Sequence, residues 1–164
     1  MDPSLSSALG IVGALAALSF SAVGSALGTG NAANAAIGAW KRCYAQGKPA
    51  SFMQLTFIGA PLSQTIYGMV VMFSLLGKVF PKADEVTGAI AAPFPGLAAL
   101  GVGIFAGLAI GWSAWYQGRA AAAAADAFGE TDKGFSNYLA ALGVIETVAI
   151  FMFVLAIIAL GSFK

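Results

Sequence analysis

Four long blocks with almost no charge dominate this chain and constrain its fold more than any other feature. They span residues 3–40, 49–77, 86–118 and 134–163, and among these 130 residues only Glu146 carries a formal charge. The other 14 charged residues crowd into the remaining 34 positions. Because each block exceeds the roughly 20 residues that a helix needs to cross a bilayer, the pattern predicts an all-α, multi-pass membrane protein with four transmembrane helices.

The composition excludes several other classes of protein. With 8 basic and 7 acidic residues and no long basic run, the chain lacks the clustered positive charge of a nucleic-acid binder. It has no histidine and a single cysteine, Cys43, so it cannot form an internal disulfide and lacks the usual zinc, copper and non-haem iron ligands. It also has no Walker motif, so any nucleotide chemistry needs another chain. We therefore expect no nucleic-acid partner and no organic cofactor.

The segments between the blocks are short and have the composition of turns. They cover residues 41–49, 80–85 and 128–134. In the first, Gly47 suits the C-terminus of a helix and Pro49 suits the first turn of the next helix. The blocks are thus expected to pair as two helical hairpins.

These hairpins are predicted at about residues 3–78 and 86–163, within a single transmembrane domain, residues 1–164. The first and third connections hold five Lys and Arg residues and the opposite side holds three. By the positive-inside rule, both hairpin turns are expected in the cytoplasm and both termini outside. In a prokaryote the location would be the cell membrane.

The two halves of the chain look alike. Residues 64–66 (QTI) match residues 146–148 (ETV) at an offset of 82, which suggests duplication of one helical hairpin. Within each half the first helix is rich in small residues, and the third block carries Gly103, Gly107 and Gly111 at four-residue spacing. Such spacing lets helices approach closely in lipid. Small helices inside and bulky helices outside are typical of a homo-oligomeric ring built from hairpins.

The single intramembrane charge is the main candidate for function. Glu146 lies twelve residues after Gly134, which places it about 18 Å along its helix, near mid-membrane. An ionised acid there costs at least about 2.5–3.5 kcal/mol. It must be protonated, bound to an ion or paired with a cation, and intramembrane acids usually mark ion or proton paths.

Other polar residues could serve this carboxylate. Ser63 and Gln64 occupy the matching position in the second span, and Gln117 lies in the third. Pro61 leaves the carbonyl four residues before it without its usual donor and distorts the helix. Gln64 alone could equally make an interhelical hydrogen bond, but the groups together favour an ion site. A sodium site would use all these oxygens, whereas a proton site needs far fewer.

One further charge follows the third block directly. Arg119 precedes five alanines and Asp126, a pattern that continues the helix out of the membrane. Its charge is expected to meet solvent, lipid phosphate or a cytoplasmic partner.

Three motifs give the chain a resemblance to a known family. They are residues 60–68 (APLSQTIYG), 116–122 (YQGRAAA) and 144–147 (VIET). With these motifs the chain resembles the duplicated four-helix proteolipid of the V-type and A-type rotary ATPases, known as the c or K subunit, which forms the membrane rotor ring.

The resemblance implies roles for particular residues. It makes Glu146 the ion carrier and Tyr67 a hydrogen-bonding support for that carboxylate. In the sodium-translocating members the ion has further ligands, which here would be Ser63, Gln64, Gln117 and the backbone carbonyl of Ala60. Serine stands where threonine is common and Ala60 is small, but neither departure removes an oxygen, so sodium is preferred over the proton.

The resemblance also implies partners. These are identical copies in the ring, a stator subunit that supplies an arginine, central-stalk subunits on the cytoplasmic side, and lipid. The chain would not be an enzyme by itself but a subunit of an ATP-driven ion pump. One carboxylate per four helices means fewer ions per turn, which favours pumping over ATP synthesis.

Three alternatives remain open. The first keeps the rotor ring but uses H⁺ as the coupling ion. The second is a small proton-coupled secondary transporter that works as a dimer with a substrate cavity. The third is a structural, channel-like proteolipid in which the intramembrane glutamate is not needed for transport.

Overall fold

The computed structural model describes residues 2–80 and 94–162 of the chain. Its elements are helix α1 (Pro3–Ala45), short helix α2 (Gln54–Gly59), the 3₁₀ turn η1 (Ala60–Leu62), and helices α3 (Ser63–Val79), α4 (Gly96–Thr131) and α5 (Phe135–Ser162). Among the residues that the structure describes, four stretches are long and apolar enough to span a membrane, and these are α1, α2 to α3, α4 and α5. The predicted all-α membrane fold is therefore confirmed.

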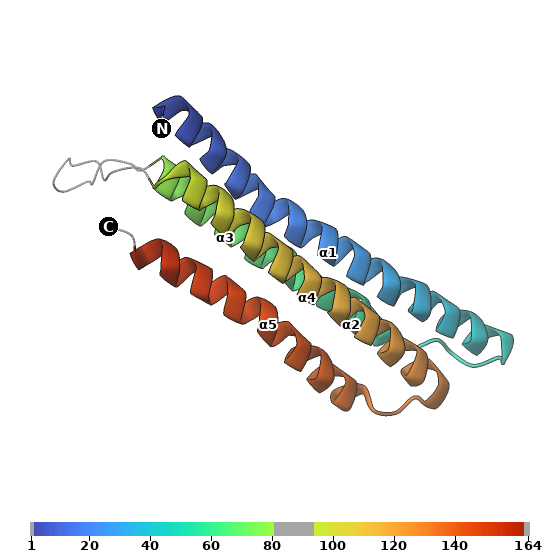
Figure 1. Cartoon of the computed structure of the whole chain (residues 1–164). Helices are drawn as coiled ribbons and strands as arrows, with labels where there is room; N and C mark the ends of the chain where they lie inside the picture. The colour runs from blue at the N-terminus through green and yellow to red at the C-terminus, as the bar shows by residue number, and fades with distance from the viewer. Residues whose placement is uncertain (1, 81–93, 163–164) are drawn as a thin grey trace, which may run out of the picture.

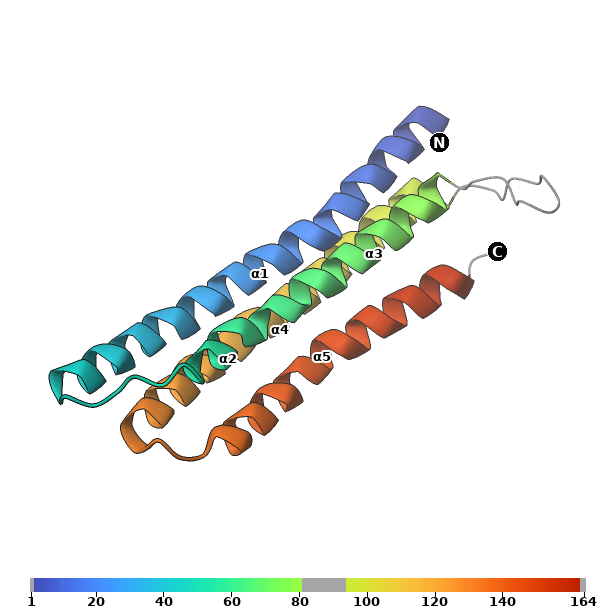
Figure 2. The ribbon, with the colours of Figure 1, turned by 180° about the vertical axis from the view of Figure 1, so that it is seen from behind.

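The helices lie side by side as an elongated bundle (Figure 1). The start of α1 and the end of α5 lie at one end of the bundle, and the α1–α2 and α4–α5 connections lie at the other, as the reverse view also shows (Figure 2). The chain thus forms two antiparallel hairpins. The helices of the first run from Pro3 to Val79, and the predicted limits of the second, residues 86 and 163, lie outside the described residues.

The first hairpin turn differs from its prediction. Gly47 adopts a positive φ of 67°, as expected beyond the end of a helix, but Pro49 does not begin the next helix, which starts at Gln54. The indole N–H of Trp40 donates to the carbonyl of Ser51 at 3.2 Å. Because this bond ties the segment after Pro49 to α1, the segment stays irregular until residue 54.

The small-residue faces of α1 and α4 form the centre of the bundle. A Cβ on Gly103 would collide with the backbone of Gly13, and one on Gly118 would collide with the backbone of Gly28. Such contacts need hydrogen as the side chain, because only then can two helix backbones approach this closely. The predicted role of the four-residue glycine spacing is confirmed, and we call this contact the glycine seam.

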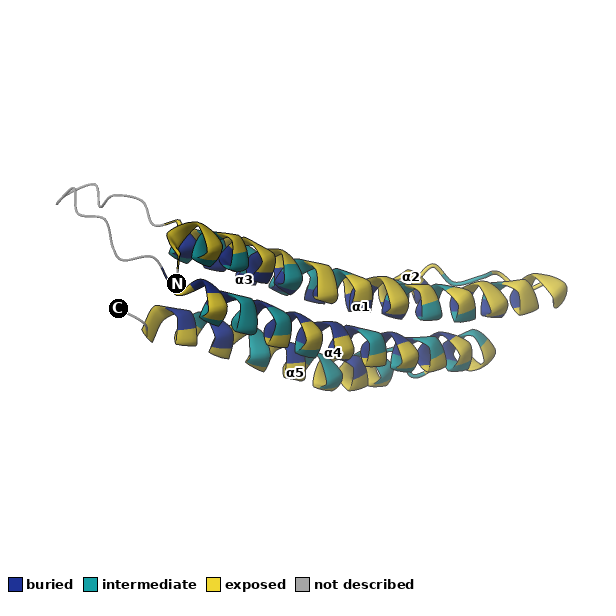
Figure 3. Cartoon of the chain, turned by 45° about the horizontal axis from the view of Figure 1, so that its top comes forward, coloured by how far each residue is buried: buried dark blue, intermediate teal, exposed yellow. Residues whose placement is uncertain are grey.

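The other helices pack around the seam and leave much apolar surface uncovered. In Figure 3 the buried residues concentrate on one side of each helix, and α5 shows many exposed positions. Val144 and Phe151 on α5 are 71% and 66% exposed. Apolar side chains this exposed suit a lipid environment or contact with further chains.

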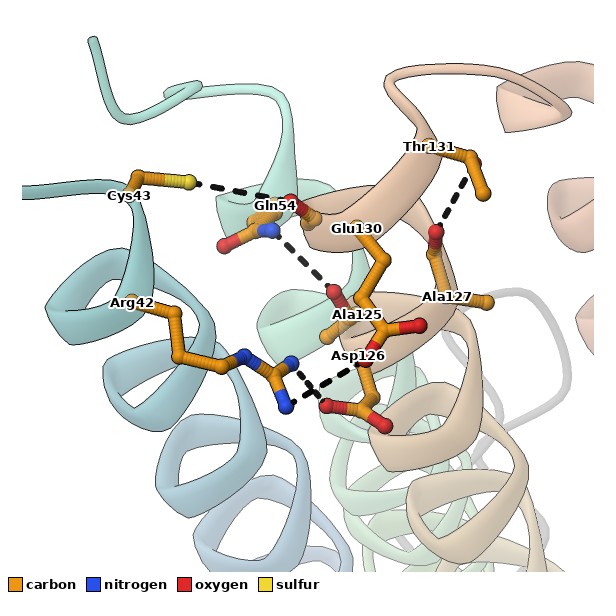
Figure 4. A network of polar contacts seen from close by, with 9 residues as sticks. Arg42, Cys43, Gln54, Ala125, Asp126, Ala127, Glu130 and Thr131 are labelled. Carbon is orange, nitrogen blue, oxygen red and sulfur yellow. Dashed lines mark hydrogen bonds and ion pairs between the residues drawn. The ribbon is translucent and has the colours of Figure 1, made fainter. Parts of the chain in front are cut away.

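Polar contacts join the two hairpins at the turn end (Figure 4). Arg42 of α1 contacts Asp126 and lies 3.5 Å from Glu130, both on α4. Nearby, the side-chain amide of Gln54 donates to the carbonyl of Ala125 at 3.1 Å. Since the Arg42 and Asp126 side chains are 45% and 53% exposed, solvent screens this ion pair and its contribution to stability is small.

Candidate functional site

The second span is interrupted by a short 3₁₀ turn next to the candidate site. Pro61 has no N–H to donate, and the helix narrows to the 3₁₀ turn Ala60–Leu62 before α3 starts at Ser63. The predicted distortion at this proline is confirmed. It places the hydroxyl of Ser63 at the start of α3 and 3.2 Å from the carbonyl oxygen of Ala60.

Glu146 of α5 receives hydrogen bonds from two other helices. Its Oε1 accepts from Ser63 Oγ at 2.6 Å and from the Tyr67 hydroxyl at 2.8 Å, both on α3. Its Oε2 accepts from Gln117 Nε2 on α4 at 3.3 Å. Both carboxylate oxygens therefore have hydrogen-bond partners on neighbouring helices.

Two buried glutamines fix the polar side of the site. Gln64 and Gln117 are 0% and 1% exposed. Gln64 Nε2 donates to Gln117 Oε1 at 2.8 Å, and Gln117 Nε2 also donates to the carbonyl of Leu142 at 3.1 Å. These bonds hold the amide of Gln117 with its nitrogen toward Glu146 and its oxygen toward Gln64.

Three oxygen atoms lie close to the Ser63 hydroxyl, which has one proton to donate. Ser63 Oγ lies 3.2 Å from the Ala60 carbonyl, 3.1 Å from Gln64 Oε1 and 2.6 Å from Glu146 Oε1. A serine hydroxyl has one proton and can donate it to only one acceptor at a time. The result is a cluster of oxygens that is short of hydrogen and suits a hard cation.

The charge of the site limits which cation it can neutralise. Glu146 is its only acidic residue, so the site as built balances one positive charge. Within residues 2–80 and 94–162 no group of three or more His, Cys, Asp or Glu side chains is placed to hold a metal ion. One carboxylate with several neutral oxygens fits a monovalent cation or a proton.

The structure brings together every residue that the sequence nominated. These are Ala60, Ser63, Gln64, Tyr67, Gln117 and Glu146, and each makes a contact given above. Their assignment as ion ligands stays a prediction, since the contacts establish proximity and hydrogen bonding.

Three supporting groups were missed from sequence. The carbonyl of Leu142 orients Gln117, the hydroxyl of Ser113 donates to the carbonyl of Ile145 at 3.1 Å, and Phe153 stacks on Tyr67 with ring centroids 5.4 Å apart. Helical spacing could have revealed two of them. Ser113 lies four residues before Gln117, and Phe153 lies seven residues after Glu146, so each shares a helix face with its site residue.

Together, four apolar spans surround one hydrogen-bonded carboxylate, and an acid inside a membrane span is by default a candidate for an ion or proton path. Residues 100–159 match the family model of the ATP synthase C subunit. The matched segment lies in the α4–α5 hairpin, which carries Gln117 and Glu146. No curated protein matches the chain closely enough to count as a relative.

The family match has functional content. It implies a rotor-ring subunit of a rotary ATPase or synthase, which is a non-catalytic membrane subunit of an enzyme complex. Members of this family carry coupling ions and assemble as rings.

Proposed function

We propose that this chain is the rotor-ring subunit of a V-type or A-type rotary ATPase and that Glu146 carries Na⁺ across the membrane. The observation that supports sodium most directly is the oxygen cluster at Ser63, where the Ala60 carbonyl, Gln64 Oε1 and Glu146 Oε1 all lie within 3.2 Å of the hydroxyl. A proton on Glu146 would not need these additional acceptors.

The proposed mechanism depends on neutralising the negative charge of Glu146 with a bound ion. An empty Glu146 is an anion and is costly to expose to lipid, whereas an occupied site is neutral. Na⁺ would enter from one half-channel beside a stator subunit, travel past lipid as the ring turns and leave through a second half-channel. A stator arginine would hold the empty carboxylate between these steps. Each charge moved against 100 mV costs about 2.3 kcal/mol, which ATP hydrolysis in the cytoplasmic head would supply through the central stalk.

The exposed surface of the bundle supports assembly into a ring. A hollow of about 870 Å³ opens between α4 and α5, and its walls include Phe105, Trp112, Tyr116 and Val148. A neighbouring copy would fill this apolar hollow and further cover Glu146, which is only half-buried in one chain. With the hairpin turns in the cytoplasm, the turn end would face the central stalk.

Carbodiimide labelling of Glu146 tests the proposal. The reagent modifies a protonated carboxyl, so a sodium ion that occupies the site should block it. We expect NaCl, but not an equal concentration of KCl, to slow labelling of the purified ring at alkaline pH. The Glu146→Gln variant gives the background from the other six acidic residues.

The outcomes separate the alternatives. If sodium gives no protection although Glu146 is labelled, the coupling ion is H⁺ and the sodium assignment is wrong. A purified dimer in place of a large ring would favour the proton-coupled transporter. Transport that persists in Glu146→Gln would favour the structural proteolipid and contradict the proposed carrier.

A further inference from the structure

Two buried hydroxyl oxygens of α1 take part in none of the contacts described so far. They belong to Ser25 and Thr29, and among the described residues neither oxygen has a hydrogen-bond partner. Ser25 as a whole is 2% exposed. By contrast, Ser21, one turn before Ser25, donates to the carbonyl of Ala17 at 2.8 Å. Because buried polar groups are rarely left without a partner, Ser25 and Thr29 indicate a group that the chain itself does not provide.

Close contacts of glycine residues fix the register of α1 against the second span. The pairs are Gly10 with Val79, Ser21 with Gly68, and Gly28 with Pro61. In each pair the two residue numbers add to 89, as expected of two antiparallel helices in contact (Figure 2). By this register Ser25 lies level with Gln64, and Thr29 lies level with Ala60. The two hydroxyls are thus at the height of the candidate ion site.

The space beside Ser25 is enclosed by neighbouring helices. A Cβ on Gly24 would collide with the backbone of Gly111, and one on Gly28 would collide with the carbonyl of Ala114, both on α4. This part of α1 therefore touches α4 as well as the second span. A group that meets the Ser25 hydroxyl must be small, which suits a single water molecule better than a larger ligand.

Gln64, level with Ser25, has a hydrogen to donate. Its Nε2 donates to Gln117 Oε1 at 2.8 Å, and the nitrogen of a side-chain amide carries two hydrogens. Gln117 differs in this respect, because its Nε2 donates both to the carbonyl of Leu142 and to Glu146 Oε2. The second hydrogen of Gln64 Nε2 is thus left for a further acceptor.

One water molecule has the right reach and valence for these three groups. Side chains four residues apart on a helix lie about 5–6 Å from each other, and a hydrogen bond between a hydroxyl and a water spans about 2.8 Å. A water between Ser25 and Thr29 would therefore reach both oxygens. Gln64 Nε2 supplies a third partner, and a buried water typically makes about three hydrogen bonds.

We propose that one buried water molecule links the Ser25 and Thr29 hydroxyls of α1 to the side-chain amide of Gln64. The water accepts from Gln64 Nε2 and donates to the two hydroxyl oxygens. Since both hydrogens of Nε2 then have acceptors, the amide is held with its Oε1 toward Ser63 Oγ, 3.1 Å away. Ser25 and Thr29 are thus positioning residues that act through Gln64. The proposal does not depend on the rotor function or on the coupling ion.

Solid-state NMR on the intact assembly in lipid tests this water with the natural chain. Glutamine is labelled with ¹⁵N, and magnetisation is transferred from water protons to the side-chain amides. We expect a contact with water for Gln64. Gln117 is the internal control, since both hydrogens of its Nε2 have acceptors in the chain and it should show no such contact. If the Gln64 amide receives no more magnetisation from water than the Gln117 amide, the proposal is wrong.

Two substitutions on α1 test which hydroxyls hold the water. Ser25→Ala should abolish the water contact of Gln64. Ser21→Ala is the matched control, because it makes the same change one turn earlier, at a hydroxyl that donates to Ala17, and it should keep the contact. Thr29→Val retains the shape of the side chain and gives the same test if Ser25→Ala fails to assemble. A water contact of unchanged strength in Ser25→Ala or in Thr29→Val overturns the proposal.

Discussion

The glycine seam allows a matched test of what holds the bundle together. Gly103 and Gly101 both lie on α4, two residues apart, yet their surroundings differ. A Cβ on Gly103 would meet the backbone of Gly13, whereas a Cβ on Gly101 would meet nothing within 4 Å. Changing each to alanine adds the same methyl group to the same helix, once against a neighbouring backbone and once into open space.

The substitutions Gly103→Ala and Gly101→Ala are expected to change the free energy of unfolding in opposite directions. Overpacking usually costs about 1–3 kcal/mol, and Gly103→Ala should fall at the upper end because the backbone of Gly13 cannot rotate away. Replacing glycine by alanine within a helix returns about 0.5–1 kcal/mol. The net loss for Gly103→Ala is then about 2 kcal/mol, or a melting temperature lower by about 4–8 °C for a chain of this size. Gly101→Ala should melt at an equal or slightly higher temperature.

The natural cysteine provides the assay. Cys43 is buried and is the only cysteine in the chain, so a thiol-reactive fluorescent dye reports unfolding without any engineered label. Gly103 lies toward the opposite end of the bundle from Cys43, and a shift in the Cys43 transition therefore reports loss of the whole packing. If Gly103→Ala and Gly101→Ala melt at the same temperature, close approach of α1 and α4 does not stabilise the bundle and the reasoning is refuted.

Three other substitutions test the site and the turn end. Ser63→Ala removes the shortest donor to Glu146 and a proposed sodium ligand, and a charge-assisted hydrogen bond worth about 1.5–3 kcal/mol predicts roughly tenfold or more weaker Na⁺ protection in carbodiimide labelling. Tyr67→Phe keeps the ring and removes only the hydroxyl, so protection should weaken by less than in Ser63→Ala; full protection would mean that the hydroxyl is dispensable. Asp126→Asn breaks the half-exposed pair with Arg42 and should lower the melting temperature only slightly, with the difference disappearing at high salt; a large, salt-independent loss would indicate a structural role.

Charge and hydrophobicity were sufficient to predict the helices but not their fine contacts. The four spans follow from uncharged length alone, and Pro61 predicted its own distortion because a missing N–H acts locally. The prediction that Pro49 begins the next helix was wrong, because the contact next to this segment is not local. The bond between Trp40 and Ser51 joins residues eleven apart, and a local rule for helix starts cannot anticipate it.

The site shows the same limit. The sequence nominated Gln64, Gln117 and Glu146 as polar residues in apolar spans. It could not predict the orientation of the Gln117 amide, because that depends on the carbonyl of Leu142 and on Gln64 from another hairpin. The relative height of these helices is set by backbone contacts along the glycine seam, such as Gly118 against Gly28, which become visible only in three dimensions.

The single hydroxyl proton of Ser63 affects how fast the site could exchange a bound cation. Three acceptors lie within reach of the Ser63 hydroxyl. The hydroxyl can donate a hydrogen bond to Glu146 when no cation is bound, and it can rotate to donate to Ala60 or Gln64 when a cation arrives. That rotation frees a lone pair for the cation and moves no heavy atom. Loading would then require no rearrangement of the backbone, and its barrier would come mainly from stripping water from the incoming ion.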